Sequence, residues 1–315
     1  MVRRVTGLPL ESQPLTPMPL TPSPTLRTAP PWFVGAWKRE WMRPRGEPAL
    51  ETSIVRDLQT PSVFGSVRIA LDRPAFVGAN SFADLDDAQL TALLAQRGGF
   101  AGTASFVDEN ATSIATSIAT SIATSVATWN HEIDFQPRNS VDAARLTQTG
   151  PTTVLEESLD GTFDELWQSV PGGDGNCLGL KITRAGRVER MLTVVGDHFV
   201  YARNRARDLP DAQSLTELVA TTHATRAQII EMLDCELSYG LVRGGRVAWE
   251  VRLSTLPWRE GGSLAFAGEE VAIDHAAGQT GAPRARVAAS GEEWTVPVNT
   301  MTREELVAMF GGSGA

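Results

Sequence analysis

The sequence predicts a mainly β protein, built as two antiparallel β-barrels with one or two short covering helices. Two observations lead to this fold class. Several runs alternate apolar and polar residues with a period of two, which is typical of strands that bury one face. The runs fall into two halves with one helical segment each, and a meander of strands can bury its apolar face by closing into a barrel.

Composition and charge limit the kinds of partner that the protein can have. The chain has 315 residues, enough for one large core or two, and a formal net charge of -9. An acidic protein is a poor partner for nucleic acid, whose phosphates attract basic surfaces, and for an anionic membrane surface. No apolar run approaches the roughly 20 residues that a membrane helix needs. We therefore predict no nucleic-acid and no membrane partner.

Residues 1–31 are rich in proline, and the prolines interrupt any apolar segment that a secretory signal would require. We predict a disordered tail here, or a start codon placed too far upstream. Because nothing marks secretion, we expect a cytoplasmic protein in which Cys177 and Cys235 stay reduced. Arginine greatly outnumbers lysine, which is typical of a GC-rich bacterial genome.

The first barrel is predicted over residues 32–150. Trp37, Arg39 and Trp41 share one face of its first strand, and a second strand runs from Val63 until Arg73-Pro74 stops its hydrogen bonding. A helix capped by Asp84 and ended by Gly98-Gly99 follows, and we expect it to cover an open barrel end.

A four-residue unit, Ser-Ile-Ala-Thr or Ser-Val-Ala-Thr, repeats over residues 112–128 and is predicted to be an expanded hairpin arm or loop. The run directly after it is the most informative in the chain. Trp129, His131, Ile133 and Phe135 alternate with polar residues and are expected to share one buried face. A histidine between apolar neighbours on such a face is unusual.

The second barrel is predicted over residues 151–315. Its clearest hairpin has a three-residue loop, Arg243–Gly245, which pairs Leu241 with Val247 and Tyr239 with Trp249. A last strand holds Trp294, Val296 and Val298. Thr302-Arg303-Glu304-Glu305 is a capping box for a closing helix.

Two segments of the second half carry a resemblance. Phe163-Asp164-Glu165-Leu166-Trp167-Gln168 and Cys235-Glu236-Leu237-Ser238-Tyr239-Gly240 resemble the fungal Hri-type family, whose fold is similar to two joined lipocalin-like β-barrels. The segments 129–137 and 254–261 also resemble an uncharacterised bacterial group. The resemblance implies a lipocalin-like fold for both barrels, and it implies no activity.

Candidate site residues gather in the first barrel. We predict that a small, mostly apolar molecule binds there, held by a set of aromatic walls and polar anchors: Trp37, Arg39, Trp41, Arg68, Trp129 and His131. One alternative is an enzyme without cofactor, a hydratase, isomerase or cyclase, in which His131 or Asp134 transfers the proton. Another is a structural or interaction module whose barrels are filled with side chains.

Other chemistries lack a signature in the sequence. The histidines at 131, 198, 223 and 275 show no metal-ligand spacing, and we predict neither a metal nor a cofactor. No nucleophile elbow or phosphate-binding loop occurs. Asp234 and Glu236 lie two apart on one strand face, where paired carboxylates could serve acid–base chemistry, but we expect a solvated salt bridge instead.

Overall fold

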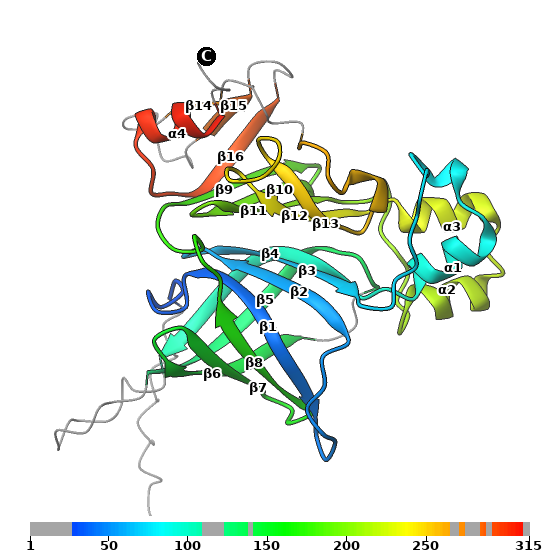
Figure 1. Cartoon of the computed structure of the whole chain (residues 1–315), viewed down its shortest axis with the longest axis horizontal. Coiled ribbons are helices and arrows are strands. Elements are labelled where there is room, and N and C mark those ends of the chain that lie inside the picture. The colour runs from blue at the N-terminus through cyan, green and yellow to red at the C-terminus, as the bar shows by residue number, and fades with distance from the viewer. Residues whose placement is uncertain are drawn as a thin grey trace, which may run out of the picture.

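The computed structural model describes residues 27–108, 123–137, 141–264, 271–274, 284–287 and 292–310, the segments 271–274 and 284–287 by their backbone. Within this part of the chain the protein is mainly β, with a closed barrel below an eight-stranded sheet (Figure 1). The helices lie at the margins of these two layers.

The barrel is an antiparallel meander in which every strand pairs with its neighbours in sequence and β8 returns to β1. Its strands are β1 (Gly35–Pro44), β2 (Ser53–Gln59), β3 (Val63–Ala70), β4 (Gly98–Asp108), β5 (Thr124–Asp134), β6 (Asp142–Gly150), β7 (Thr153–Ser158) and β8 (Phe163–Ser169). The first predicted barrel is therefore confirmed as a closed antiparallel barrel.

The predicted domain limits need two corrections. The boundary at residue 150 falls inside the barrel, because β7 and β8 close it against β1. The predicted tail ends too late, because Arg27 exchanges backbone hydrogen bonds with Phe106 and Ala29 is buried. Residues 1–26 and most of the repeat, 112–122, lie outside the described residues. The last repeat unit forms the start of β5.

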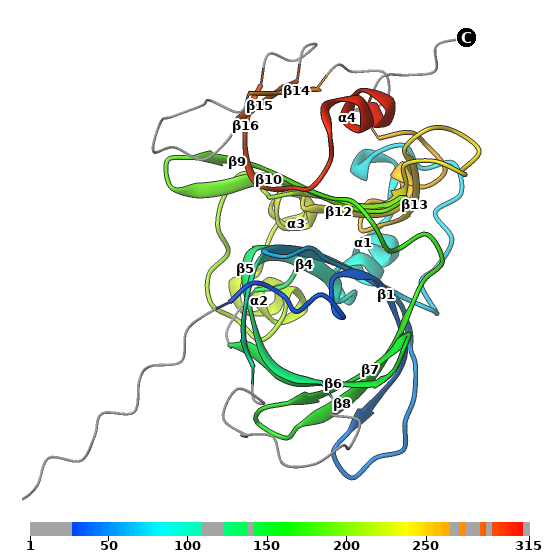
Figure 2. The same ribbon diagram turned by 90° about the vertical axis from the view of Figure 1, so that its left-hand side faces the viewer.

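The second half forms a curved sheet in the order β13-β12-β11-β10-β9-β16-β15-β14, and a second closed barrel is not confirmed (Figure 2). Its strands are β9 (Cys177–Arg184), β10 (Arg187–Val195), β11 (His198–Arg203), β12 (Glu236–Leu241), β13 (Glu250–Ser254), β14 (Val271–Asp274), β15 (Arg284–Val287) and β16 (Glu293–Asn299). Helix α4 (Arg303–Phe310) lies across the face turned away from the barrel and buries Leu306 and Phe310 there. The predicted capping box starts it, with Thr302 and Glu305 hydrogen-bonded reciprocally.

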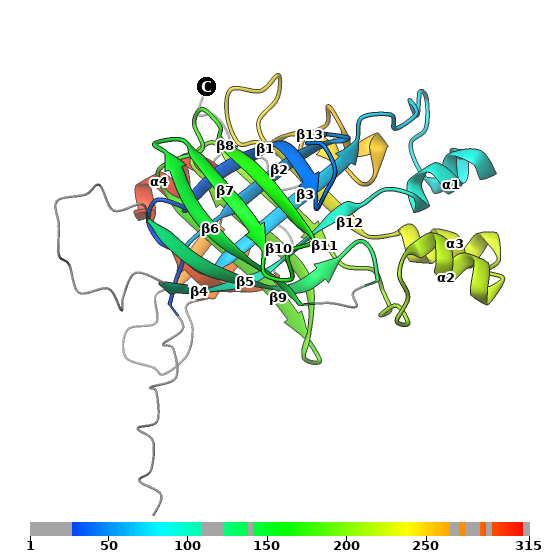
Figure 3. The same ribbon diagram turned by 90° about the horizontal axis from the view of Figure 1, so that it is seen from below.

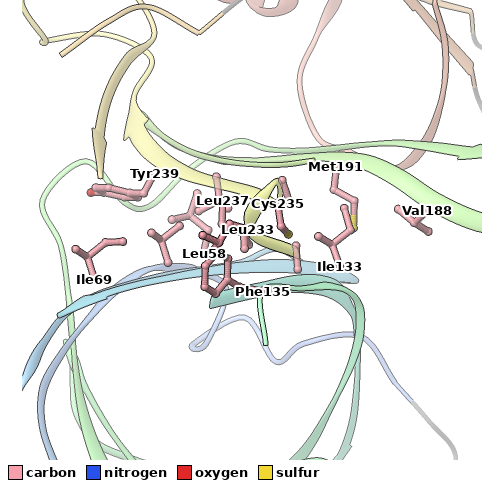
Figure 4. Close-up of a cluster of buried hydrophobic side chains, with 14 of the residues drawn as sticks. Leu58, Ile69, Ile133, Phe135, Val188, Met191, Leu233, Cys235, Leu237 and Tyr239 are labelled. Carbon is pink, nitrogen blue, oxygen red and sulfur yellow. The ribbon is translucent and has the colours of Figure 1, made fainter. Parts of the chain in front are cut away.

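An apolar layer joins the barrel to the sheet (Figure 4). Leu58, Ile69 and Ile133 point outward from the barrel, and Leu237 and Tyr239 meet them from β12. Gly65 brings the layers close together, because a Cβ there would lie 2.6 Å from a methyl group of Val200. The two layers thus share one core, so neither buries this surface alone.

Three helices pack together beside this junction (Figure 3): α1 (Asp87–Leu94), α2 (Leu215–Thr222) and α3 (Arg226–Leu233). Short 3-10 turns, η1 (Phe82–Asp84) and η3 (Pro257–Arg259), flank them. The predicted helix exists, but Asp86 caps it rather than Asp84. It does not cover the barrel end, because its leucines join the shared apolar layer instead.

The predicted register of the β12–β13 hairpin is wrong. Leu241 pairs with Glu250 and Tyr239 with Leu253, so the loop is longer than three residues. The physical reason is Trp249, whose positive φ of 54° turns its ring into the core beneath α4, 5.1 Å from the ring of Phe310. Burial of this large ring outweighs the tighter turn.

We expect Leu237→Ala to lower the free energy of unfolding by about 2–5 kcal/mol, because this side chain is fully buried in the shared layer. Denaturant unfolding followed by circular dichroism measures this, with Val77→Ala, at an exposed position, as the control. Leu237→Ala should show a single unfolding transition, with its midpoint at a lower denaturant concentration than in the wild type. Two transitions, of which only one moves, would contradict a shared core.

Candidate functional site

A β-bulge in β5 shapes the barrel mouth. His131 pairs with Gly102 and Ile133 with Ala101, so Glu132 is the extra residue of the bulge. Trp129 and His131 therefore face the interior, whereas Ile133 and Phe135 join the apolar layer outside. The prediction that these four side chains share one face is wrong for this reason. The bulge also places Asp134 on the same face of the strand as His131.

The imidazole of His131 is held between two carboxylates. Its Nδ1 lies 2.7 Å from Oδ2 of Asp134, and its Nε2 lies 3.0 Å from Oδ2 of Asp142. Phe100 stacks on the ring at a centroid distance of 3.8 Å. Burial acts to lower the pKa of His131, but the hydrogen bonds and charges of both aspartates outweigh burial and raise it. The ring is thus set up to carry a positive charge.

Arg39 is the second buried cation. Its guanidinium binds both carboxylate oxygens of Glu51, at 2.8 and 3.0 Å, and Oε1 of Glu165 at 2.5 Å. Only 2% of the Arg39 side chain is exposed. With carboxylates on both sides, this arginine is committed to internal ion pairs, and it cannot offer a free guanidinium to an anionic ligand without breaking one of them.

More carboxylates face the interior between these two cations. Burial, followed by the charges of Asp142 and Glu165, raises the pKa of Asp57 to about 7 even though Arg68 and Ser66 act in the opposite direction. Burial and the charge of Glu165 also raise the pKa of Glu156 well above its usual range. The interior therefore holds carboxyl groups that keep protons near neutral pH.

Aromatic rings fill the opposite end of the barrel. Phe33 enters from the segment before β1 and stacks on Trp37 at 5.6 Å, with Phe106 and Trp129 edge-on at 6.1 and 6.5 Å. The indole of Trp37 donates to the carbonyl of Phe33, and that of Trp129 donates to Gln59. Packed rings fill the barrel here, and a pocket of about 550 Å³ lined by Trp32, Val34 and Trp37 opens beside them. The opposite end, with His131, is called the mouth below.

A pocket of about 400 Å³ opens at this mouth. His131, Asp134, Asp142 and Asp160 supply its charged groups. The rest of its lining is apolar apart from one hydroxyl side chain: Pro137, Val141, Ala143, Ser158, Leu159 and Phe163. The pocket combines a small ionic group with apolar surface, which is typical of sites for small molecules.

The structure brings most of the predicted residues together. Trp37, Arg39, Arg68, Trp129 and His131 face the barrel interior. Trp41 does not, because a bulge after Arg39 pairs it with Leu166 on the outer face, where the guanidinium of Arg43 lies over its ring. Trp37 and Trp129 belong to the aromatic end rather than to the mouth beside His131, and Trp37 lines the pocket at that end. Asp134, predicted as an alternative proton carrier, lines the pocket.

Sequence reasoning missed the interior carboxylates Glu51, Asp57, Asp142, Glu156 and Glu165. A signal existed for one of them. Glu165 alternates with Trp167 in β8, and an arginine on the tryptophan face of β1 requires a buried acidic partner. The acidic pair predicted as a solvated salt bridge forms ion pairs, Asp234 with Arg203 and Glu236 with Arg259. The prediction is wrong in detail, because Asp234 ends α3 instead of lying on the strand and Glu236 is buried.

The chain matches no family model and no curated protein. Among solved structures it is similar to an uncharacterised protein of Saccharomyces cerevisiae, YLR301w, with 13% identity and a TM-score of 0.48. The similarity covers 85% of this chain and 99% of the yeast chain. The resemblance to the fungal family stays a prediction.

None of the helices in the described segments has the length and apolar composition of a membrane span.

We expect Arg39→Met to lower the free energy of unfolding by about 3–5 kcal/mol, because it leaves Glu51 and Glu165 buried without a cation. Arg43→Met is the matched control on the same strand, where the ion pair with Asp164 is half exposed and contributes at most about 1 kcal/mol. Urea unfolding measures both changes. Equal losses in the two variants would contradict the buried ion-pair network.

Asp57 should make stability depend on pH. Its raised pKa means that the folded protein binds more protons than the unfolded chain from about pH 4 to 7, so its contribution to stability is lost as the pH rises through 7. Relative to Asp57→Asn, we expect the wild type to lose about 2 kcal/mol between pH 5 and 8, a figure reduced because water reaches this side chain. Unfolding free energies at both pH values measure this, and a constant difference would contradict it.

Proposed function

We propose that this protein binds a small, partly apolar molecule in the mouth of its barrel. The observation that carries the proposal is the pocket beside His131. Its volume of about 400 Å³ falls within the roughly 300–1,000 Å³ of small-molecule sites. Apolar side chains such as Leu159 and Phe163 would surround the body of the ligand, and the ion cluster of His131 would fix its polar end.

Space inside the barrel supports binding over a purely structural role. Asp57, Arg68 and Phe100 face the interior of a closed barrel, yet each is only partly buried. In a barrel filled with side chains such residues would be shielded completely. Part of the surface of these three side chains is therefore accessible to water rather than packed.

Binding is also favoured over proton-transfer catalysis. A general base needs a ring nitrogen that faces the substrate, but both nitrogens of His131 lie within hydrogen-bond distance of carboxylates. Catalysis would require Asp134 or Asp142 to release the ring first. The arrangement suits a fixed charge that orients a ligand.

Titration with the neutral fluorophore N-phenyl-1-naphthylamine tests the proposal. The probe should brighten on entering the pocket, and Phe163→Ala should weaken its binding about tenfold, because burial of the ring contributes about 1.5–3 kcal/mol. Leu50→Ala, at an exposed position outside the pocket lining, is the control.

The absence of saturable binding by the wild type would overturn the proposal. Equal binding by wild type and Phe163→Ala, with both folded by circular dichroism, would place the probe elsewhere and overturn it too. His131→Ala distinguishes binding from catalysis, because it should weaken a binder modestly but abolish the turnover of an enzyme.

A further inference from the structure

One buried carboxylate oxygen inside the barrel has no hydrogen-bond donor among the described residues. Oε1 of Glu165 accepts a hydrogen bond from Arg39, but Oε2 of Glu165 accepts none from the described residues. Only 3% of this side chain is exposed. A buried carboxylate oxygen without a partner costs free energy, so such an atom in a native protein indicates a missing donor.

The strand register aims this oxygen into the barrel interior. Glu165 pairs directly with Glu156 of the neighbouring strand, and both face inward beside Trp167. Trp167 donates its indole N–H to Oε2 of Glu156, at 2.9 Å, and so occupies one oxygen of that residue. Burial and the charge of Glu165 raise the pKa of Glu156, so ionisation of both carboxyl groups across this strand pair is unfavourable, and a cation between them would offset the repulsion.

Acidic side chains outnumber basic ones inside the barrel. The described acidic residues that face the interior or bind its cations are Glu51, Asp57, Asp134, Asp142, Glu156 and Glu165. The described cations are Arg39, Arg68, His131 and, at the rim, the exposed Arg97. These cations are fewer than the acidic groups, but burial makes ionisation of two of the acids, Asp57 and Glu156, unfavourable in the empty barrel, so the excess of negative charge arises when a bound cation favours their ionisation. Arg39 and His131 are each already bound to two carboxylates.

We infer that the barrel interior receives the cationic group of the ligand, an ammonium or guanidinium, at Oε2 of Glu165 with Glu156 and Asp57 nearby. This inference rests on the proposed function and adds the chemical class of the ligand, an organic cation with an apolar body. Arg39 holds Glu165 in place from the other side. In the described part of the chain these carboxylates do not form a metal-ligand group. An organic cation donates several hydrogen bonds and fits the paired carboxylates.

Three probes with the same six-carbon body separate the charge from the apolar part: hexylammonium, 1-hexanol and hexanoate. Each is titrated at pH 8 against the wild-type protein loaded with N-phenyl-1-naphthylamine, and displacement of the fluorophore is measured. We expect hexylammonium to bind at least tenfold more tightly than 1-hexanol. We expect hexanoate to bind more weakly than both, because the interior repels a further negative charge.

Glu165→Gln should reduce the preference for hexylammonium at least tenfold and leave the affinity for 1-hexanol unchanged. Because this variant weakens the support of Arg39, Glu156→Gln serves as a second test, in which an amide oxygen can still accept from Trp167. Glu157→Gln, next in β7 and facing outward, is the matched control and should keep the preference. Circular dichroism shows which variants are folded.

The two proposals fail in different ways. Equal affinities for hexylammonium and 1-hexanol, or tighter binding of hexanoate, would overturn the cation site while leaving ligand binding intact. A preference that survives both Glu156→Gln and Glu165→Gln would overturn it as well. Failure of N-phenyl-1-naphthylamine to bind the wild type would overturn the proposed function and the cation site together.

Discussion

The apolar layer between the barrel and the sheet governs the chemistry of the barrel interior. Strands β2 to β5 turn several aliphatic side chains outward, where Leu58 and Ile133 meet the sheet. Because side chains alternate along a strand, the residues between them point inward, and several of these are polar. Asp57 in β2 and Arg68 in β3 are examples. The covered wall thus turns some charged residues inward, and the strands outside the cover add others, Arg39 in β1, Asp142 in β6, Glu156 in β7 and Glu165 in β8.

The interior charges in turn hold the strands together at the mouth. Arg39 connects β1 to β8 and to the residue before β2, while His131 connects the end of β5 to the start of β6. These contacts act across neighbouring strands, so the acidic and basic groups form one network around the opening. In the described part of this network, Oε2 of Glu165 has no hydrogen-bond partner, and the proposed ligand class rests on this atom.

Sequence patterns predicted the parts of the fold that are set locally. The period of two identified most of the described strands, and the capping box at Thr302 identified α4. Pairing between distant segments was beyond the pattern, which is why β7 and β8 were assigned to the wrong half. Alternation also fails at a bulge, where one extra residue, Glu132, reverses the faces of Ile133 and Phe135. For the site, the pattern found His131 and Arg39 but gave too little weight to the acidic partners that a buried cation requires.

The order of strands along the chain has a consequence for biosynthesis. All eight barrel strands precede the first strand of the sheet, so the barrel can close on the ribosome as soon as residue 169 has emerged. At that moment the outward wall of β2 to β5 is still uncovered, and it stays so until β9 to β12 have been translated. During this period the nascent chain exposes an aliphatic surface that favours association with other chains.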